Sequence, residues 1–407
     1  MKTPLGIYRN LPASIYVLFT SQVINSAGMF VYPFLTLYLT QILGYTALKA
    51  GMLMTLSSIL YIPGSLIGSK LADSIGRKPV MVVFQILMDL SYIACGFFEG
   101  TEFLPVMVLV ALFFDGAVDP AREALKTDVT DMENRQNSFS LLYLGHNVGS
   151  AIGPLVAGYL FLVAPKWLFW GNGIAGMIAT TLVIIKIPES KPSKEVLEAS
   201  KGWKTTEKGE DGGIIKALFT RPQLLLFTLF LSFSWYAYSQ MFFALPLITT
   251  SLFGPGGSKI YGTLMGFNGL LVVLFNPIFV HRLKRFHPLA NCTIANLFMM
   301  VSFLLFSFAT SVPFFFLLAI GYTFGEIIQA TNDHYWIANN TPITHRGRFN
   351  AILPLIIGSG SAFAPTIGGA IITRFGFTTL WLITAAAAFI AAAGMMSLRL
   401  QEKKEAV

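Results

Sequence analysis

Acidic residues stand inside several long apolar stretches of this 407-residue sequence. Asp115 and Asp119 lie in the run over residues 103–126, and Glu326 lies in the run over 312–339. A charged side chain at membrane depth costs several kcal/mol, so such residues are rare and mark functional sites. Burial favours the neutral form of a carboxyl group, and a group that alternates between buried and hydrated surroundings can carry a proton. These residues therefore indicate proton exchange.

The spacing of these residues says more about their neighbours. Asp115, Asp119 and Arg122 are spaced i, i+4 and i+7, on one face of a helix. Two interpretations stay open, a structural ion pair between Asp119 and Arg122 or a direct role in transport. Glu326 has no basic residue within one helical turn in sequence. We therefore expect burial to favour its protonated form.

Other chemistries find less support. His146 either relays protons or hydrogen-bonds across helices as a neutral ring, and Asp89 is expected to hydrogen-bond to a neighbouring helix. Cys95 and Cys292 are too few for a disulfide framework or a cysteine-based metal site. No metal motif such as H-E-x-x-H and no Gly-rich phosphate loop ending in Lys-Ser/Thr occurs. The sequence predicts no cofactor, no metal, no ATP site and no enzyme activity.

The composition shows which elements must position these residues. The chain is 54% hydrophobic and 12% charged, whereas soluble domains are about 25% charged. A helix needs roughly 20 apolar residues to span a membrane, and such runs recur along the chain. We expect helices over residues 13–39, 46–70, 79–99, 103–126, 138–163, 167–187, 221–250, 259–283, 288–310, 312–339, 347–373 and 377–399.

One long polar segment separates the first six runs from the last six. We predict an N-terminal bundle over residues 1–187, a cytoplasmic linker over 188–220 and a C-terminal bundle over 221–407. Lys and Arg accumulate in cytoplasmic loops, and with both termini cytoplasmic only four of the 28 lie outside: Lys49, Lys166, Lys259 and Arg374. The net charge of +8 thus reports topology and not nucleic-acid binding. No cleavable signal peptide is apparent, so the first helix directs insertion.

The two halves repeat at a fixed offset. Pro154 in the run GSAIGPLVAG corresponds to Pro365 in GSAFAPTIGG, 211 residues later, and the same offset pairs Asp115 with Glu326. We therefore predict an all-α membrane protein of twelve transmembrane helices in two pseudo-symmetric six-helix bundles. In this layout a substrate binds near the bilayer midplane, and the halves rock to alternate access.

The stretch GSKLADSIGRKP, which begins at Gly68, resembles the helix 2 to 3 loop signature of the major facilitator superfamily. Gly68 permits close helix approach, and Gly76 permits a sharp turn. The resemblance implies that Asp73 accepts hydrogen bonds from the start of the eleventh helix and latches the outward-facing state. Arg77 and Lys78 belong to this conformational gate, or they are topology signals whose side chains reach the lipid headgroups.

A second motif bears on the direction of transport. Gly149, Gly153, Pro154 and Gly158 resemble the antiporter motif G-x-x-x-G-P-x-x-G-G of the superfamily, with Ala157 in place of one Gly. Small residues on one face and a proline kink suit a tightly packed helix that resists leakage. The resemblance favours antiport, with plain helix packing as the alternative.

In this superfamily helices 1, 4, 7 and 10 line the central cavity, so the resemblance selects Asp115, Asp119 and Glu326. Further candidates for the substrate cavity on these helices are Gln22, Asn25, Met29, Tyr32, Arg122, Trp235, Tyr236, Tyr238 and Gln240. Aromatic and amphipathic side chains suit a lipophilic or cationic guest. Ordinary helix packing and an interfacial aromatic belt are the alternative.

The leading hypothesis is a proton-coupled exporter of small lipophilic or cationic compounds, similar to the drug:proton antiporter branch of the superfamily. Its expected partners are a small-molecule substrate, protons and membrane lipids. We expect a monomer in the plasma membrane, the inner membrane of a bacterium. The alternatives are uptake of a sugar, peptide or other nutrient, lipid flipping, and a non-transporting receptor or scaffold. A scaffold has no reason to keep Asp115 and Glu326 in apolar helices.

Overall fold

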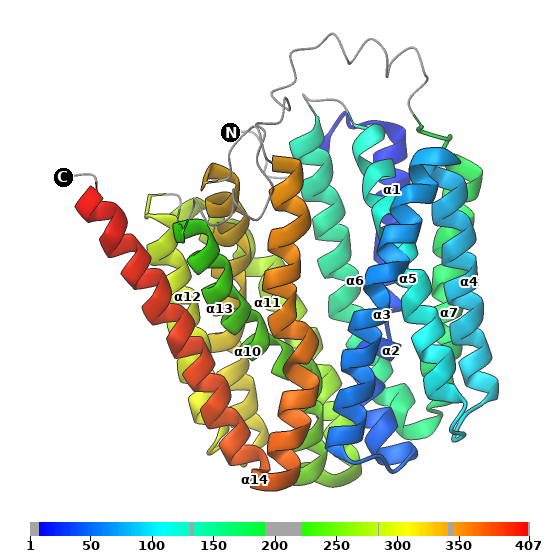
Figure 1. Ribbon diagram of the computed structural model, residues 1–407. Coiled ribbons are helices and arrows are strands. Elements are labelled where there is room, and N and C mark those ends of the chain that lie inside the picture. Colours follow the sequence, from blue (N-terminus) through cyan, green and yellow to red (C-terminus); the bar gives the residue numbers. More distant parts are fainter. Residues whose placement is uncertain (1–7, 131–133, 192–221, 284, 341–345, 406–407) are drawn as a thin grey trace. The chain divides into compact units, whose positions relative to one another are not determined.

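The computed structural model describes residues 8–130, 134–191, 222–283, 285–340 and 346–405, and within them the chain is helical with no strand (Figure 1). This follows from the apolar composition, because in lipid each backbone N–H and C=O must be bonded within its own helix. The described residues contain ten helical runs long and apolar enough to cross a membrane. Most of the predicted linker, 188–220, lies outside the described residues.

The helices of the first half begin and end within a few residues of the predicted ranges. They are α1 (Ala13–Ala27), α2 (Val31–Leu37), the π-helical turn η2 (Tyr38–Ile42), α3 (Ala47–Ser74), α4 (Arg77–Phe97), α5 (Leu104–Asp128), α6 (Arg135–Val163) and α7 (Lys166–Lys186). The second half contains α10 (Pro222–Phe253), the 3-10 turn η3 (Gly254–Gly256), α11 (Gly257–Leu283), α12 (Pro288–Phe306), α13 (Val312–Asn340) and α14 (Arg346–Glu405).

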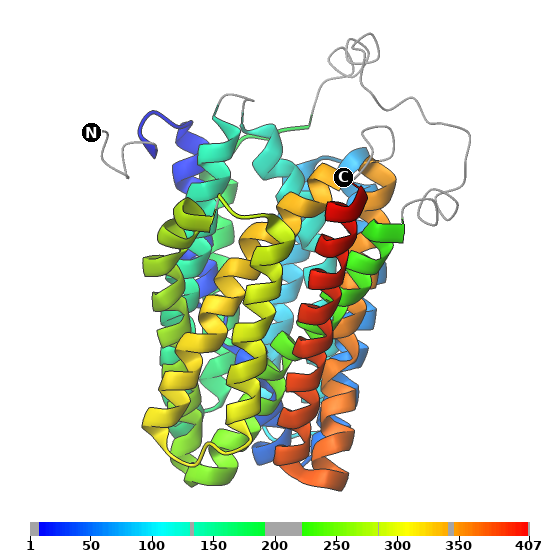
Figure 2. The same ribbon diagram turned by 90° about the vertical axis from the view of Figure 1, so that its left-hand side faces the viewer.

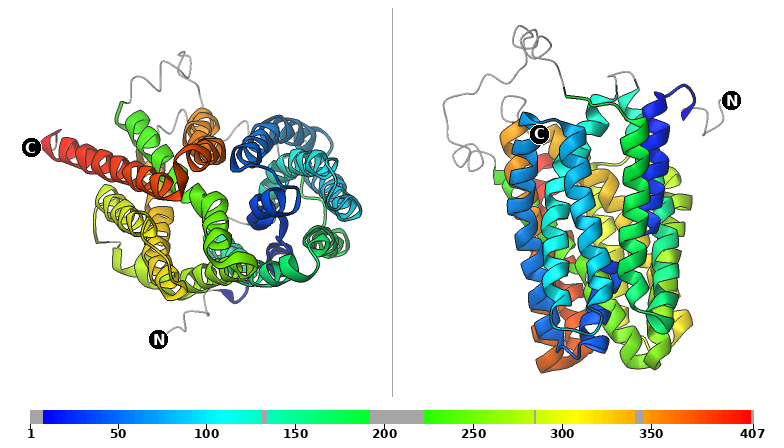
Figure 3. Two further views of the ribbon diagram at one scale, coloured as in Figure 1. Left: turned by 90° about the horizontal axis from the view of Figure 1, so that it is seen from below. Right: turned by 90° about the vertical axis from the view of Figure 1, so that its right-hand side faces the viewer.

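The chain divides into two compact units. The first comprises Met1–Tyr45, Leu53–Leu197 and Thr249–Val273, and the second comprises Thr46–Met52, Glu198–Ile248 and Leu274–Val407. In the first unit α1 packs against α6 and α7, and α4 packs against α5 and α7 (Figures 1 and 3). In the second unit α12 packs against both α13 and α14 (Figure 2).

The first predicted helix, over residues 13–39, is not continuous. It is interrupted after Ala27, and α2 begins at Val31. Pro33 has no N–H to donate to the Met29 carbonyl, which weakens the helix at this point. Asn172 of α7 compensates, because its side-chain oxygen accepts hydrogen bonds from the backbone N–H groups of Phe30 (3.1 Å) and Val31 (3.3 Å). Irregular backbone at membrane depth is tolerated where such partners or a cavity satisfy it.

The boundary between the last two predicted helices, 347–373 and 377–399, lies inside α14. Gly376 has φ 79° and ψ 178°, a conformation that interrupts the helical path and is accessible to glycine. The helix therefore consists of two segments that meet at this residue.

The offset of 211 residues recurs in close helix contacts of the two units. In the first unit, a Cβ atom added to Gly262 of α11 would lie 2.3 Å from the Pro154 carbonyl oxygen of α6. In the second unit, a Cβ added to Gly51 would lie 2.2 Å from the Pro365 carbonyl oxygen. Gly51 and Gly262 are 211 residues apart, and so are Pro154 and Pro365. Equivalent backbones thus approach closely enough to require glycine.

Candidate functional site

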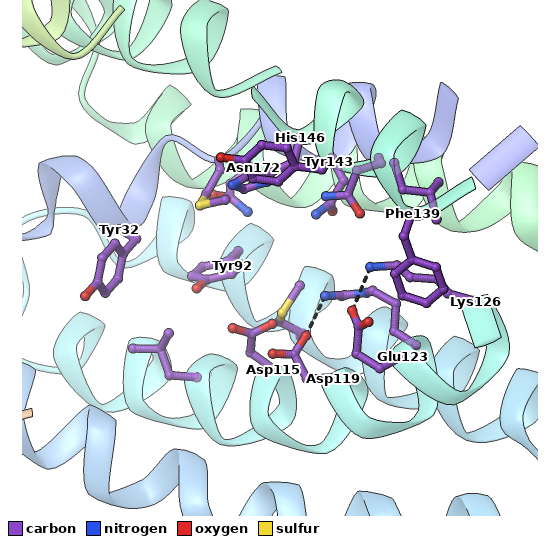
Figure 4. A pocket seen from close by; sticks show the side chains of 17 residues that line it. Tyr32, Tyr92, Asp115, Asp119, Glu123, Lys126, Phe139, Tyr143, His146 and Asn172 are labelled. Atoms are coloured by element: carbon purple, nitrogen blue, oxygen red, sulfur yellow. Dashed lines mark hydrogen bonds and ion pairs between the residues drawn. The ribbon is translucent and has the colours of Figure 1, made fainter. Parts of the chain in front are cut away.

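The first unit contains an open cavity of about 550 Å³. Its wall combines ionisable groups of α5 with amide, methionine and tyrosine side chains from the surrounding helices (Figure 4). Sequence-predicted residues on this wall are Gln22, Asn25, Met29, Tyr32, Asp115, Asp119, Arg122 and His146. Met88, Tyr92, Glu123, Lys126 and Asn172 join them. A volume of this size accommodates a small organic molecule.

Asp115 presents a carboxylate to the middle of this cavity. Figure 4 shows it beside Asp119 on one helix, with Tyr92 across from it. Within the described part of the chain, no hydrogen bond or ion pair reaches Asp115. A carboxylate among tyrosine and methionine side chains attracts a cation, through its charge and through the faces of the rings.

Asp119 is held differently, by two partners. Arg122 Nη1 donates to Asp119 Oδ1 at 2.7 Å, and the Tyr61 hydroxyl of α3 donates to the other carboxylate oxygen. Arg122 Nη2 in turn donates to Gln85 Oε1 of α4 at 2.7 Å. The spacing of the sequence thus places Asp119 and Arg122 in contact, and the guanidinium joins α5 to α4. The contact is compatible with both interpretations of this pair.

His146 lies on the opposite wall, on α6. Its Nδ1 is 3.0 Å from Ser26 Oγ of α1, and Ser26 also accepts a hydrogen bond from Gln22 at 3.1 Å. The imidazole therefore contacts a neighbouring helix while it lines the cavity. This arrangement fits the cross-helix hydrogen bond and leaves proton relay as a hypothesis.

The second unit contains a smaller cavity, of about 100 Å³, around Glu326 of α13. Trp235 and Tyr238 of α10 line it, and the Tyr238 hydroxyl donates to Glu326 Oε1 at 2.9 Å. The structure places two other predicted residues elsewhere. Tyr236 is buried, and Gln240 is buried with its amide donating to the Ala364 carbonyl at 3.1 Å.

The sequence as a whole also matches a known family. The profile of the Major Facilitator Superfamily matches residues 18–335. The chain belongs to this superfamily. Its members are membrane transporters and not enzymes.

Relatives within the superfamily cover almost the whole chain. An uncharacterized MFS-type transporter of Bacillus subtilis, YqjV, is 26% identical over 84% of this chain and 82% of its own length. A Na(+), Li(+), K(+)/H(+) antiporter of Planococcus maritimus is 24% identical over 88% and 89%. The quinolone resistance protein NorA of Staphylococcus aureus is 23% identical over 88% and 89%.

A solved structure shows the same fold. A mutant of the peptide transporter POT superimposes with a TM-score of 0.79 and 14% sequence identity, over 96% of this chain and 95% of the other. At this identity the likeness establishes the major facilitator fold alone.

The transporter's first signature motif forms a compact ionic cluster. Arg77 lies 3.3 Å from both Asp73 and Asp128, and it also donates to the Ala72 carbonyl at 3.0 Å. Lys78 donates to the Ile184 carbonyl at 2.8 Å. The predicted latch from Asp73 to the eleventh helix joins the two units and stays a prediction.

Glycines shape the same motif. A Cβ on Gly68 would lie 2.0 Å from the Ala117 carbonyl oxygen of α5, so the predicted close approach is confirmed. Gly76 has φ 134°, so the predicted sharp turn is confirmed as well. Glu189 caps the helix that follows, since its carboxylate accepts the Arg77 backbone N–H at 3.0 Å.

The second motif packs α6 against two helices. A Cβ on Gly149 would lie 2.6 Å from the Val23 carbonyl oxygen of α1, and one on Gly153 would lie 3.0 Å from the Ser26 carbonyl oxygen. A Cβ on Gly158 would lie 3.0 Å from the Ser258 carbonyl oxygen of α11. Together with the contact at Pro154, these distances describe a face built for close packing.

Sequence reasoning missed several polar residues of the site. Tyr61, Gln85 and Asn172 occur singly in apolar runs, without a spacing that marks them. Asp128 and Glu189 lie at helix ends, where acidic residues are common. Only Gln85 carried a usable signal, because it lies i−4 from Asp89.

Proposed function

We propose that this chain is a proton-coupled exporter of small lipophilic or cationic compounds. The observation that carries the proposal is the Asp115 carboxylate, which faces a cavity of about 550 Å³ whose wall includes Tyr32 and Tyr92. The carboxylate and the aromatic faces favour a cation, and the apolar parts of the wall favour a lipophilic body. The names of the quinolone-resistance and cation/proton antiporter relatives support the same class.

The proposed mechanism is alternating access in the inner membrane of a bacterium, with both termini cytoplasmic and the protein acting as a monomer. Two of the ten apolar runs, Pro222–Leu283 and Leu353–Lys404, are 62 and 52 residues long. Each is long enough for two crossings. Twelve crossings, arranged as two related bundles, are therefore part of the proposal.

Glu326 is the proposed carrier of the coupling proton. It stands at the position related to Asp115 by the repeat, and Tyr238 orients one of its oxygens. One proton entering down about 100 mV releases about 2.3 kcal/mol. A tenfold substrate gradient costs about 1.4 kcal/mol, so this energy sustains a gradient of about 50-fold. No ATP site is needed.

The test is proton movement driven by substrate in proteoliposomes. Glu326→Gln mimics the protonated form and should abolish coupled export while leaving insertion and folding intact. Asp115→Asn is the matched variant at the repeat-related position, and we expect it to weaken binding of cations more than of neutral compounds. If Glu326→Gln couples proton flux to export at the parental ratio, another group carries the proton.

Uptake of a sugar or peptide, or lipid flipping, is the alternative. Arg122 and Lys126 on the cavity wall are the observation in its favour, because they could bind a substrate carboxylate or phosphate. Transport into inverted vesicles separates export from uptake. A proton-coupled exporter accumulates its substrate inside such vesicles when their interior is more acidic than the medium. Substrate leaving such vesicles would support uptake.

A further inference from the structure

Asp89 of α4 is buried in the first unit. Its exposed fraction is 0%, and Gln85 Nε2 of the same helix donates to its Oδ1 at 3.0 Å. Among the described residues its Oδ2 has no hydrogen-bond partner. The sequence predicted a hydrogen bond from Asp89 to a neighbouring helix. This prediction is wrong, because the hydrogen bond that Asp89 accepts comes from Gln85 of its own helix.

The neighbouring helices offer little to a charged carboxylate. On α7, Gly176 faces Asp89, and a Cβ there would lie 2.1 Å from Oδ1. On α5, the nearby charges are Asp115, Asp119 and Arg122, and α4 itself adds Tyr92. The guanidinium is directed to Asp119 and to Gln85 Oε1, not to Asp89. A buried carboxyl group with one neutral donor is cheaper to hold in its protonated form.

A continuous row of contacts nevertheless joins Asp89 to the cavity. Asp89 bonds to Gln85, Gln85 to Arg122, and Arg122 to Asp119, with distances of 3.0, 2.7 and 2.7 Å. Asp119 lies on the cavity wall, and its side chain is 39% exposed. Gln85 and Arg122 also line a chamber of about 20 Å³, which has room for about one water molecule.

We propose that Asp89 is an occluded proton-binding site whose proton is exchanged for a cationic substrate through Arg122. The inference rests on the proposed function, and it adds a second exchangeable proton to the one that Glu326 carries. A cation that binds Asp119 displaces the guanidinium, which turns past Gln85 and pairs with Asp89. The O–H bond at Oδ2 then breaks, and the proton passes to water in the cavity. One positive charge enters the site and one leaves it, so the net buried charge stays constant.

The reverse step follows from the same balance. When the cation leaves Asp119, Arg122 returns to it, and Asp89 takes a proton from water because its charge has lost its partner. The exchange therefore needs Asp119 to be reachable and Asp89 to be closed off, as their exposures of 39% and 0% show.

Asp89→Asn tests this directly, because asparagine has nearly the same shape and keeps an oxygen for the Gln85 donor but cannot release a proton. The probe is tetraphenylphosphonium, a permanent cation with no proton of its own, added to purified protein in weakly buffered detergent. We expect the protons released per bound cation to fall by about one relative to the parental protein. An unchanged number would overturn the inference.

Two further measurements keep the outcomes apart. If the parental protein binds the cation without releasing protons, or does not bind it, the proposed function fails as well. If Asp89→Asn does not insert stably, infrared difference spectra of protein labelled at aspartate carboxyl carbons supply the test in an Asp115→Asn background. Cation binding should remove a protonated-aspartate carbonyl band, and Arg122→Ala should prevent this. A band that persists in the Arg122-containing protein, at a cation concentration that saturates its binding, contradicts the proposal.

Discussion

Tyr238 of α10 donates a hydrogen bond of 2.9 Å to Glu326 of α13. A donor aimed at a carboxylate favours its charged form, so this tyrosine makes proton release from Glu326 easier. Tyr238→Phe keeps the ring and removes the donor. A hydrogen bond to a charged group contributes about 1.5–3 kcal/mol, so we expect the midpoint of the transport pH profile to rise by about one pH unit or more.

The measurement is the initial rate of proton-driven export across a pH series in proteoliposomes. Tyr335→Phe is the control, since Tyr335 lies on α13, the helix of Glu326, with 59% of its surface exposed. If the pH profile of Tyr238→Phe coincides with the parental profile, this hydrogen bond plays no part in proton coupling.

Close contacts between repeat-related helices give a second prediction, about stability. Gly262→Ala and Gly51→Ala each place a methyl group about 2 Å from a backbone carbonyl oxygen, which a side-chain rotation cannot relieve. We expect each to cost about 1–3 kcal/mol or more through forced helix separation. Gly358→Ala is the control, because a Cβ there meets nothing within 4 Å. Thermal unfolding in detergent should rank the two variants below the control, and equal midpoints would contradict the close approach described above.

Much of the fold follows from the sequence because lipid imposes few solutions. Apolar length sets where helices lie, so the predicted ranges match α3 to α7 within a few residues. The offset of 211 residues anticipated that Pro154 and Pro365 occupy equivalent contacts. Gly76 was predictable too, because a turn between two long helices needs a residue that tolerates positive φ.

The contacts of the site were less predictable, because they depend on which faces of distant helices meet. Asn172, about 140 residues further along the chain, accepts the backbone N–H groups that the interruption between α1 and α2 leaves without helical partners. Gln85 bridges Arg122 and Asp89 only because α4 packs on α5. Glu189, interpreted as part of a linker, caps α4 instead. The periodicity of a sequence shows which face of a helix is apolar, but it does not show which other helix packs against that face.

A third prediction concerns alkaline stability. Tyr45, between two membrane spans, is buried and donates a hydrogen bond to Glu102. Burial, with the Glu102 contact, raises the pKa of Tyr45 to about 12 from its ordinary value of 10.0. Its contribution to stability is therefore complete below about pH 10 and is lost as the pH rises toward 12.

Tyr45→Phe isolates this contribution. We expect the parental protein to unfold at a higher temperature than the variant at pH 8, by the equivalent of about 1 kcal/mol. The difference should shrink above about pH 10, because only the tyrosine loses its proton there. A difference that stays constant to pH 12 would show that the pKa of Tyr45 is the same in the folded and the unfolded protein, which contradicts the prediction.

The last prediction concerns the two-pronged contact of Arg122. Its two terminal nitrogens each donate at 2.7 Å, one to Asp119 and one to Gln85. Arg122→Lys preserves the charge, but a single ammonium does not reproduce the planar fork that reaches both partners. Losing one charge-assisted hydrogen bond costs about 1.5–3 kcal/mol, so the export rate should fall about tenfold or more with little change in folding. Lys126→Arg is the matched control, because among the described residues Lys126 forms its ion pair with Glu123 only, at 2.7 Å, and we expect its rate to stay within about twofold of the parental value. Equal rates for Arg122→Lys and Lys126→Arg would mean that the charge of Arg122 suffices and that its bridge to Gln85 plays no part in transport.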